Sequence, residues 1–75
     1  MSDNNKTFKE TLGKKIEALR TQRKLGVREF ALIADIEHHQ LINIEKGRVD
    51  IRISTLIKIA KGLDVEPKEL LDFRI

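Results

Sequence analysis

Apolar residues recur along the first third of the chain at the spacing of a single helix face. They are separated by steps of four, four and three residues, at Phe8, Leu12, Ile16 and Leu19. This period is that of an amphipathic α-helix, and it predicts a helix at about 8–24. Residues 1–7 are mostly polar and lack this period, so we expect a flexible N-terminal segment there.

Shorter apolar segments follow, separated by residues that favour turns and helix ends. They predict four further helices, at about 27–34, 38–46, 53–62 and from Pro67 onward. Pro67 suits the first position of a helix, where an N–H group would have no partner in any case. Gly26, Gly47 and Gly62 are expected to end the helices before them. Five short helices joined by short loops predict a compact all-α domain, a five-helix bundle at 8–75.

The chain has 75 residues, of which 40% are hydrophobic and 36% charged, which is the composition of one small soluble domain. It has no cysteine, so a disulfide, a thiol nucleophile and a cysteine-ligated zinc are excluded. No apolar run exceeds five residues, which excludes a membrane span, and the first six residues lack the apolar region of a signal peptide. We therefore expect a cytoplasmic protein with no membrane partner.

The patterns that carry enzyme or cofactor chemistry are missing. The sequence has no glycine-rich phosphate loop, no nucleophile with a base and an orienting group, and no carboxylates paired for acid–base catalysis. His38 and His39 are adjacent and would point about 100° apart on a helix, so they cannot readily share one metal ion. We expect no enzyme activity, no cofactor and no metal site.

The net charge of +3 is unevenly distributed along the chain. Residues 6–28 carry eight Lys and Arg against two Glu, residues 29–45 carry four acids and neither Lys nor Arg, and residues 46–75 carry seven bases against five acids. A basic first segment suits an anionic partner such as DNA, although a solvated helix surface would give the same pattern. The acidic middle segment does not fit a simple DNA-binding surface.

The second and third predicted helices, with three residues between them, form a helix-turn-helix pattern. Close crossing of such helices requires a small residue in the first helix, here Ala31. It also requires apolar residues after the turn and in the second helix, here Ile36, Leu41 and Ile44. The spacing alone is only moderately specific, because any helical hairpin could share it.

Four segments carry a more specific resemblance, with the sequences LGKKIEALR, IEKG, LIKIAKGL and EPKELL, at 12–20, 44–47, 56–63 and 66–71. Through them the chain resembles the Cro/phage-repressor (Xre-type) family of helix-turn-helix domains over most of its length. The resemblance implies a lambda-repressor-like domain of five helices that binds double-stranded operator DNA, commonly as a homodimer. It also implies an ion pair between Arg20 and Glu45, which would turn this acid inward.

By position in that family, residues 38–46 form the recognition helix that lies in the major groove. The resemblance places four side chains at base edges, where Gln and Asn can pair with adenine and His can donate or accept: His38, His39, Gln40 and Asn43. It places a second set at phosphates, where they position the protein without reading sequence: the side chains of Arg28, Lys46, Arg48 and Arg52, and the backbone N–H of Val27.

Several positions depart from the family pattern. Val27 stands where the family often has a Gln that grips phosphate, so only its backbone N–H remains for that contact. Asp35 stands at the turn position that often holds Gly, and it would adopt a left-handed conformation at some cost. Glu37 stands where Ser or Thr opens the recognition helix, and DNA would repel its carboxylate unless it accepts from a cytosine amine.

Together these observations predict a sequence-specific DNA-binding transcriptional regulator, a homodimeric repressor. Phe73 and Ile75 form an apolar chain end that we expect at the dimer contact, and Leu32 and Ile33 are expected to pack against the first helix or the N-terminal segment. The alternative is a helix-turn-helix domain that has become a protein-interaction module, such as the antitoxin of a toxin–antitoxin pair. The acidic segment 29–45 and the apolar Leu32-Ile33 pair favour this alternative.

Overall fold

A computed structural model describes residues 2–73, and within this range it contains five α-helices and no β-strand. The helices are α1 (Ser2–Gln22), α2 (Val27–Ala34), α3 (His38–Glu45), α4 (Ile53–Leu63) and α5 (Pro67–Leu70). The prediction of an all-α domain of five helices is confirmed, and the last four helices begin at the predicted residues. None of the helices in this range combines the length and the apolar character that a bilayer crossing requires.

The first helix begins earlier than its apolar pattern indicates. Residues 2–7, expected to be a flexible segment, belong to α1, which starts at Ser2 rather than near residue 8. The apolar stripe begins only at Phe8, so its period could not locate the earlier turns. Once the packed turns exist, each residue added upstream completes a hydrogen bond without a new nucleation step. The predicted start of this helix is therefore wrong.

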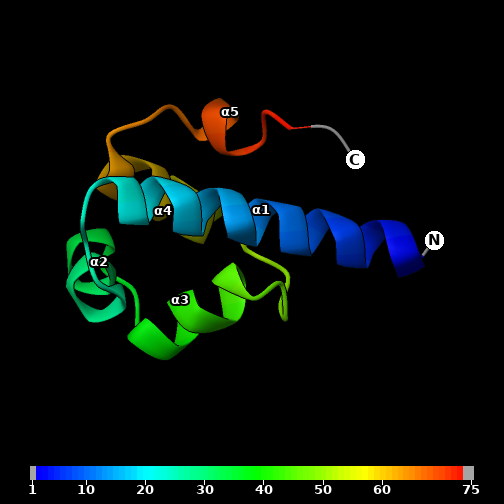
Figure 1. The fold of residues 1–75 in the computed structure, drawn as a ribbon, viewed down its shortest axis with the longest axis horizontal. Coiled ribbons are helices and arrows are strands. Elements are labelled where there is room, and N and C mark those ends of the chain that lie inside the picture. The colour runs from blue at the N-terminus through cyan, green and yellow to red at the C-terminus, as the bar shows by residue number, and fades with distance from the viewer. Residues whose placement is uncertain (1, 74–75) are drawn as a thin grey trace.

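α1 lies at the centre of the fold and contacts α3, α4 and α5, while α2 contacts α3 and α4. Figure 1 shows α5 on one side of α1 and the pair formed by α2 and α3 on the other. Residues 35–37 join α2 to α3, as the helix-turn-helix pattern predicts. α3 is therefore held by α1 and α2 and keeps one side uncovered.

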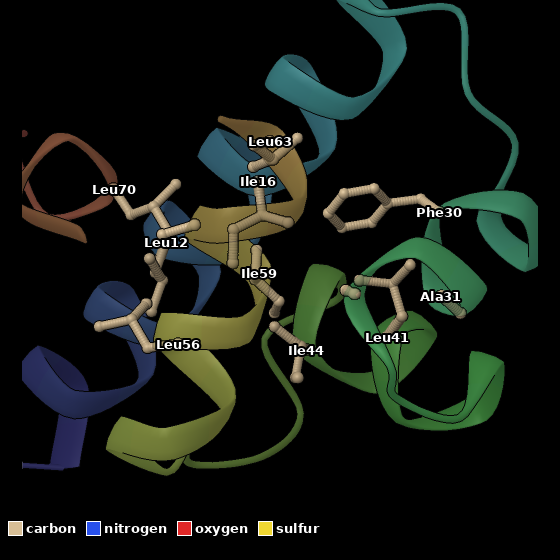
Figure 2. Close-up of a cluster of buried hydrophobic side chains, with 12 residues drawn as sticks. Leu12, Ile16, Phe30, Ala31, Leu41, Ile44, Leu56, Ile59, Leu63 and Leu70 are labelled. Atoms are coloured by element: carbon tan, nitrogen blue, oxygen red, sulfur yellow. The ribbon is translucent and has the colours of Figure 1, made fainter. Parts of the chain in front are cut away.

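The core takes one apolar face from every helix. Its largest fully buried side chains are Ile16, Phe30, Leu41, Ile59, Leu63 and Leu70. The ring of Phe30 points from α2 toward Ile16 of α1 and Leu63 of α4 (Figure 2). Ala31 is also buried, which meets the requirement for a small residue where α2 and α3 cross. Because α2 is anchored at the centre of this cluster, its orientation is set by packing rather than by helix propensity.

Two glycines allow α1 and the end of α3 to approach closely. A Cβ atom at Gly13 would lie within 3.0 Å of the backbone carbonyl oxygens of Ile44 and Glu45, and a Cβ at Gly47 would lie within 3.0 Å of the backbone of Glu10. Neither neighbour is a flexible side chain that could move aside. The absence of a side chain at both positions therefore fixes how near α3 lies to α1.

Three helices end in a left-handed residue that is not glycine: Lys24, Asp35 and Asp64, with φ angles of 58°, 60° and 58°. After each of these residues the chain turns back toward the helix that it has just left. The N–H of Leu25 donates to the carbonyl of Arg20 at 3.3 Å, and the N–H of Ile36 donates to the carbonyl of Ala31 at 3.0 Å. This is the Schellman arrangement, which satisfies carbonyls at a helix end. Asp35 thus takes the expected conformation.

Two predicted helix ends are wrong. Gly26 does not end α1; it has an extended backbone with φ −75° and precedes α2. Gly62 lies inside α4, where a Cβ would come within 3.0 Å of the ring of Phe30. Both glycines suggested helix ends because glycine tolerates the left-handed conformation at which helices often end. Neither takes it here: Gly26 is extended, and Gly62 lets α4 pack closely against Phe30.

Leu32 and Ile33 do not pack against α1, because their side chains are 83% and 53% exposed. α2 buries Phe30, Ala31 and Ala34, and residues 32 and 33 lie on the other side of this eight-residue helix. The expected packing is therefore wrong: α2 has neighbours on one side only.

Replacing Lys24 by glycine should stabilise the fold. The left-handed conformation strains a lysine and not a glycine, so Lys24→Gly is expected to raise the free energy of unfolding by about 0.5–1 kcal/mol after the entropy cost of glycine is subtracted. Urea unfolding measures this change. Gln22→Gly, at the last residue of α1, is the matched control and should lower the stability; equal effects from both variants would contradict the interpretation.

Candidate nucleic-acid interface

α3 has a buried side and an outward side. Its buried residues are Leu41, Ile44 and Glu45. His39 and Gln40 are exposed, and His38 and Asn43 are half-buried. Asn43 lies one turn after His39, opposite the buried residues. None of the four predicted base-contact residues is in the core, so all four reach the surface of the helix-turn-helix unit.

Arg20 of α1 and Glu45 of α3 form a bidentate pair in the interface between these helices. Arg20 Nε donates to Glu45 Oε2 at 2.7 Å, Nη2 donates to Oε1 at 3.0 Å, and Nη1 donates to the carbonyl oxygen of Leu25 at 2.7 Å. The hydrogen bonds to Glu45 raise the pKa of Arg20. The pair implied by the resemblance is therefore present, and it holds the last turn of α3 on α1.

The predicted phosphate-contact residues lie around α3 rather than along it. Val27 and Lys46 line an open depression of about 430 Å³ beside α1, and Arg52 lines another of about 620 Å³ between the helix-turn-helix unit, chiefly its turn, and α4. Arg28 lines a third, of about 480 Å³, together with the two histidines. Cations thus flank the outward side of α3, where the phosphates of a duplex run when a helix lies in its major groove.

One of the four acids in residues 29–45 is removed from the surface, and two others make exposed contacts within the protein. Glu45 is buried in its pair with Arg20. Asp35 lies 3.7 Å from the ammonium of Lys58, which also donates to the Asp35 carbonyl at 3.3 Å. Glu29 accepts from the N–H of Gly26 at 3.3 Å. The negative charge that would face a duplex is therefore smaller than the sequence indicates.

The first turn of α3 has no side-chain cap. Glu37 precedes it, is exposed, and makes no hydrogen bond to the helix through its carboxylate. Arg52 likewise leaves α4 without a side-chain cap. Uncapped N–H groups together with the helix dipole favour an anion such as phosphate. Glu37 remains the unfavourable acid beside this surface.

Two side chains outside α3 contact the amides predicted to read bases. Gln40 Nε2 lies 3.5 Å from Thr55 Oγ1, and Arg48 Nη1 donates to Asn43 Oδ1 at 3.3 Å. Thr55 is buried near the start of α4. The sequence does not single out Thr55 or Lys58, because their partners lie in other elements, Gln40 in α3 and Asp35 in the turn before it, and no local spacing relates them.

The two histidine rings lie beside each other, with centroids 4.3 Å apart and planes tilted by 35°. Desolvation, the charge of Arg28 and the neighbouring His39 lower the pKa of His38. Within residues 2–73, no group of three His, Asp or Glu side chains is placed to hold a metal ion.

Phe73, predicted at a dimer contact, packs on its own chain. Its ring meets that of Phe8 edge-on, with centroids 5.0 Å apart, because the long α1 carries Phe8 to the end of α5. Phe73 is half-buried and Phe8 is 43% exposed. Ile75, the other predicted contact, lies outside the described residues.

Comparison with protein-family models matches residues 13–72 to the helix-turn-helix domain family. The chain belongs to this family. The match includes α2, the turn and α3, so the helix-turn-helix domain spans all the residues that surround the outward side of α3.

Two curated proteins resemble this helix-turn-helix domain. Control protein C.BamHI of Bacillus amyloliquefaciens is 31% identical over 62 residues, which cover 81% of this chain and 76% of the relative. An uncharacterised HTH-type transcriptional regulator of Rickettsia conorii is 38% identical over 53 residues, which cover 71% of this chain and 42% of the relative.

Solved structures show the same arrangement. The restriction-modification controller protein C.AhdI of Aeromonas hydrophila superposes with a TM-score of 0.80 and 26% identity, over 81% of this chain and 92% of its own. An HTH_3 family transcriptional regulator of Vibrio cholerae superposes with a TM-score of 0.84 and 28% identity, over 89% of this chain and 38% of its own.

Removing one partner of the buried pair should destabilise the domain. Arg20→Met leaves the carboxylate of Glu45 buried without its partner, so the free energy of unfolding is expected to fall by about 3–5 kcal/mol. The double variant Arg20→Met/Glu45→Leu should recover much of this loss, because an apolar pair needs no desolvated charge. Urea unfolding of both variants measures the effect, and a double variant as unstable as the single one would contradict it.

Proposed function

We propose that this helix-turn-helix domain is a sequence-specific DNA-binding transcriptional regulator that reads the major groove with α3. The observation that carries the proposal is the outward side of α3, with His39 and Asn43 one turn apart and with Lys46 and Arg52 in two separate depressions beside the helix. Such a surface matches a groove whose floor offers hydrogen-bonding base edges and whose walls are phosphates. The relatives named as transcriptional regulators and controller proteins support the same function.

The proposal includes a homodimer bound to two half-sites about one helical turn, roughly 34 Å, apart. The chain end is the proposed contact, because the half-buried Phe73 and the 44% exposed Leu71 leave apolar surface there. A domain of this size buries only about 60% of its unfolded surface, so it gains stability from covering such a patch.

The antitoxin alternative is not favoured by the comparisons, since the relatives are named as regulators and controller proteins. The exposed Leu32 and Ile33 keep an apolar patch on α2, but Glu45 is buried against Arg20 and does not add to the acidic surface that had suggested a partner.

Base reading and phosphate contact should separate under mutation. Selection from a random duplex pool should yield a preferred sequence for the wild type, and Asn43→Ala should relax the preference at one base pair by about 1–3 kcal/mol. Lys46→Gln should instead weaken every sequence alike and make the salt slope shallower by about one. Binding titrations at several salt concentrations measure both effects. A flat salt dependence, or no preference over random duplex, would contradict the proposal.

Binding should strengthen as the pH falls. The pKa of His38 lies below its usual value of 6.5 in the free protein, and nearby phosphates would raise it in the complex. A group with a higher pKa in the complex takes up a proton on binding, so affinity rises as the pH falls and levels off below the pKa of the free protein. The total gain in DNA affinity from high to low pH depends on how far the pKa of His38 rises on binding. Each tenfold increase in its proton affinity in the complex, relative to the free protein, should give a gain of about tenfold. The variant His38→Gln/His39→Gln should show a flat profile; an unchanged profile would exclude the histidines from the interface.

A further inference from the structure

We propose that Arg48 sets which base Asn43 reads, by holding the amide of Asn43 in one orientation. This inference rests on the proposed function and names a specificity-determining residue within it. Arg48 is expected from the resemblance to be a phosphate contact without sequence information, whereas its guanidinium donates to Asn43 Oδ1 at 3.3 Å. Arg48 is a positioning residue in this role, because it acts through Asn43.

The end of α3 brings these two residues together. Gly47 has a φ of +70°, so the chain turns back over the last turn of the helix. The N–H of Gly47 then donates to the carbonyl of Ile44 at 3.0 Å, and the N–H of Arg48 donates to the carbonyl of Asn43 at 3.0 Å. Arg48 is thus bound to Asn43 by its backbone as well as by its side chain, which lowers the entropy cost of the side-chain contact.

The chemistry of arginine decides how the amide of Asn43 is oriented. A guanidinium has five N–H donors and no acceptor, so only the oxygen of the Asn43 amide can face it. The Nδ2 amine is therefore left to point away from Arg48. The contact between Gln40 and Thr55 is different, because a hydroxyl can either donate or accept. Thr55 leaves both orientations open to Gln40, whereas Arg48 leaves one to Asn43.

The oriented amide favours a base edge that offers acceptors. A bidentate pair with adenine needs the amide oxygen to accept from N6 while the amine donates to N7. In this protein the oxygen already accepts from a cation, and the neighbouring guanidinium would repel the N6 amine. Guanine presents two acceptors, O6 and N7, in the major groove. Asn43 is therefore assigned to guanine in preference to adenine. A duplex that covers this exposed contact would exclude water and strengthen it.

The test compares three variants of the full chain, Asn43→Ala, Arg48→Met and Lys46→Met, with the double variant Asn43→Ala/Arg48→Met. Lys46→Met is the matched control, because it removes an exposed cation from the end of the same helix. Dissociation constants are measured for the duplex selected by the wild type and for its single-base-pair substitutions. Circular dichroism and thermal unfolding check that each variant is folded.

The wild type should prefer guanine at the base pair where Asn43→Ala loses discrimination. Arg48→Met should reduce the preference for guanine over adenine at that base pair by about three- to tenfold, which is the effect of one hydrogen bond. Lys46→Met should lower all affinities by one common factor. In the Asn43→Ala background, Arg48→Met should also lower all affinities by one factor, because the amide that it orients is gone.

Three results would overturn the inference: adenine preferred by the wild type at that base pair, a uniform loss for Arg48→Met, or no base pair that responds to Asn43→Ala. A wild type that selects no sequence at all would instead remove the proposed function on which the inference rests. In the free protein, the side-chain amide resonance of Asn43 should shift in Arg48→Met and stay in place in Lys46→Met. This measurement tests the contact itself without DNA.

Discussion

The packing of α3 on α1 is the interaction on which the rest of the structure depends. Gly13 lets the backbone of α1 approach the last carbonyls of α3, and Arg20 neutralises the one acid that this approach buries. The bidentate geometry fixes orientation as well as distance. Because one side of α3 is held in this way, its other side is presented as a rigid surface.

The same contact explains how an acidic segment can belong to a DNA-binding unit. The charge count of residues 29–45 describes the chain and not its surface. Glu45 is removed from the surface by Arg20, and Asp35 is paired with Lys58 at the turn between α2 and α3. The buried pair and the exposed one differ in strength, since water screens the contact of Lys58. In both pairs, the cation and the acid come from segments that are far apart in the sequence.

Periodicity and turn residues were sufficient to predict five helices and the starts of the last four, because those features are local. They failed where the cause is not local. The start of α1 depends on extension of an already packed helix, and Lys24 takes a left-handed conformation that favours glycine because tertiary packing outweighs its strain. The pairing of Arg20 with Glu45 came from family resemblance, since residues 25 positions apart share no spacing rule. The side chains that contact Gln40 and Asn43 could be identified only from the three-dimensional structure, for the same reason.

Gly47 ends α3 and touches Glu10 of α1 with no room for a side chain. Tolerance to amino-acid exchange should therefore fall sharply at this point of the chain. A methyl group there would meet two separate penalties, one from the backbone conformation and one from collision with α1. The neighbouring Val49 and Asp50 are exposed and free of both constraints. A natural variant of this domain has room to diversify the loop, but only from Val49 onward.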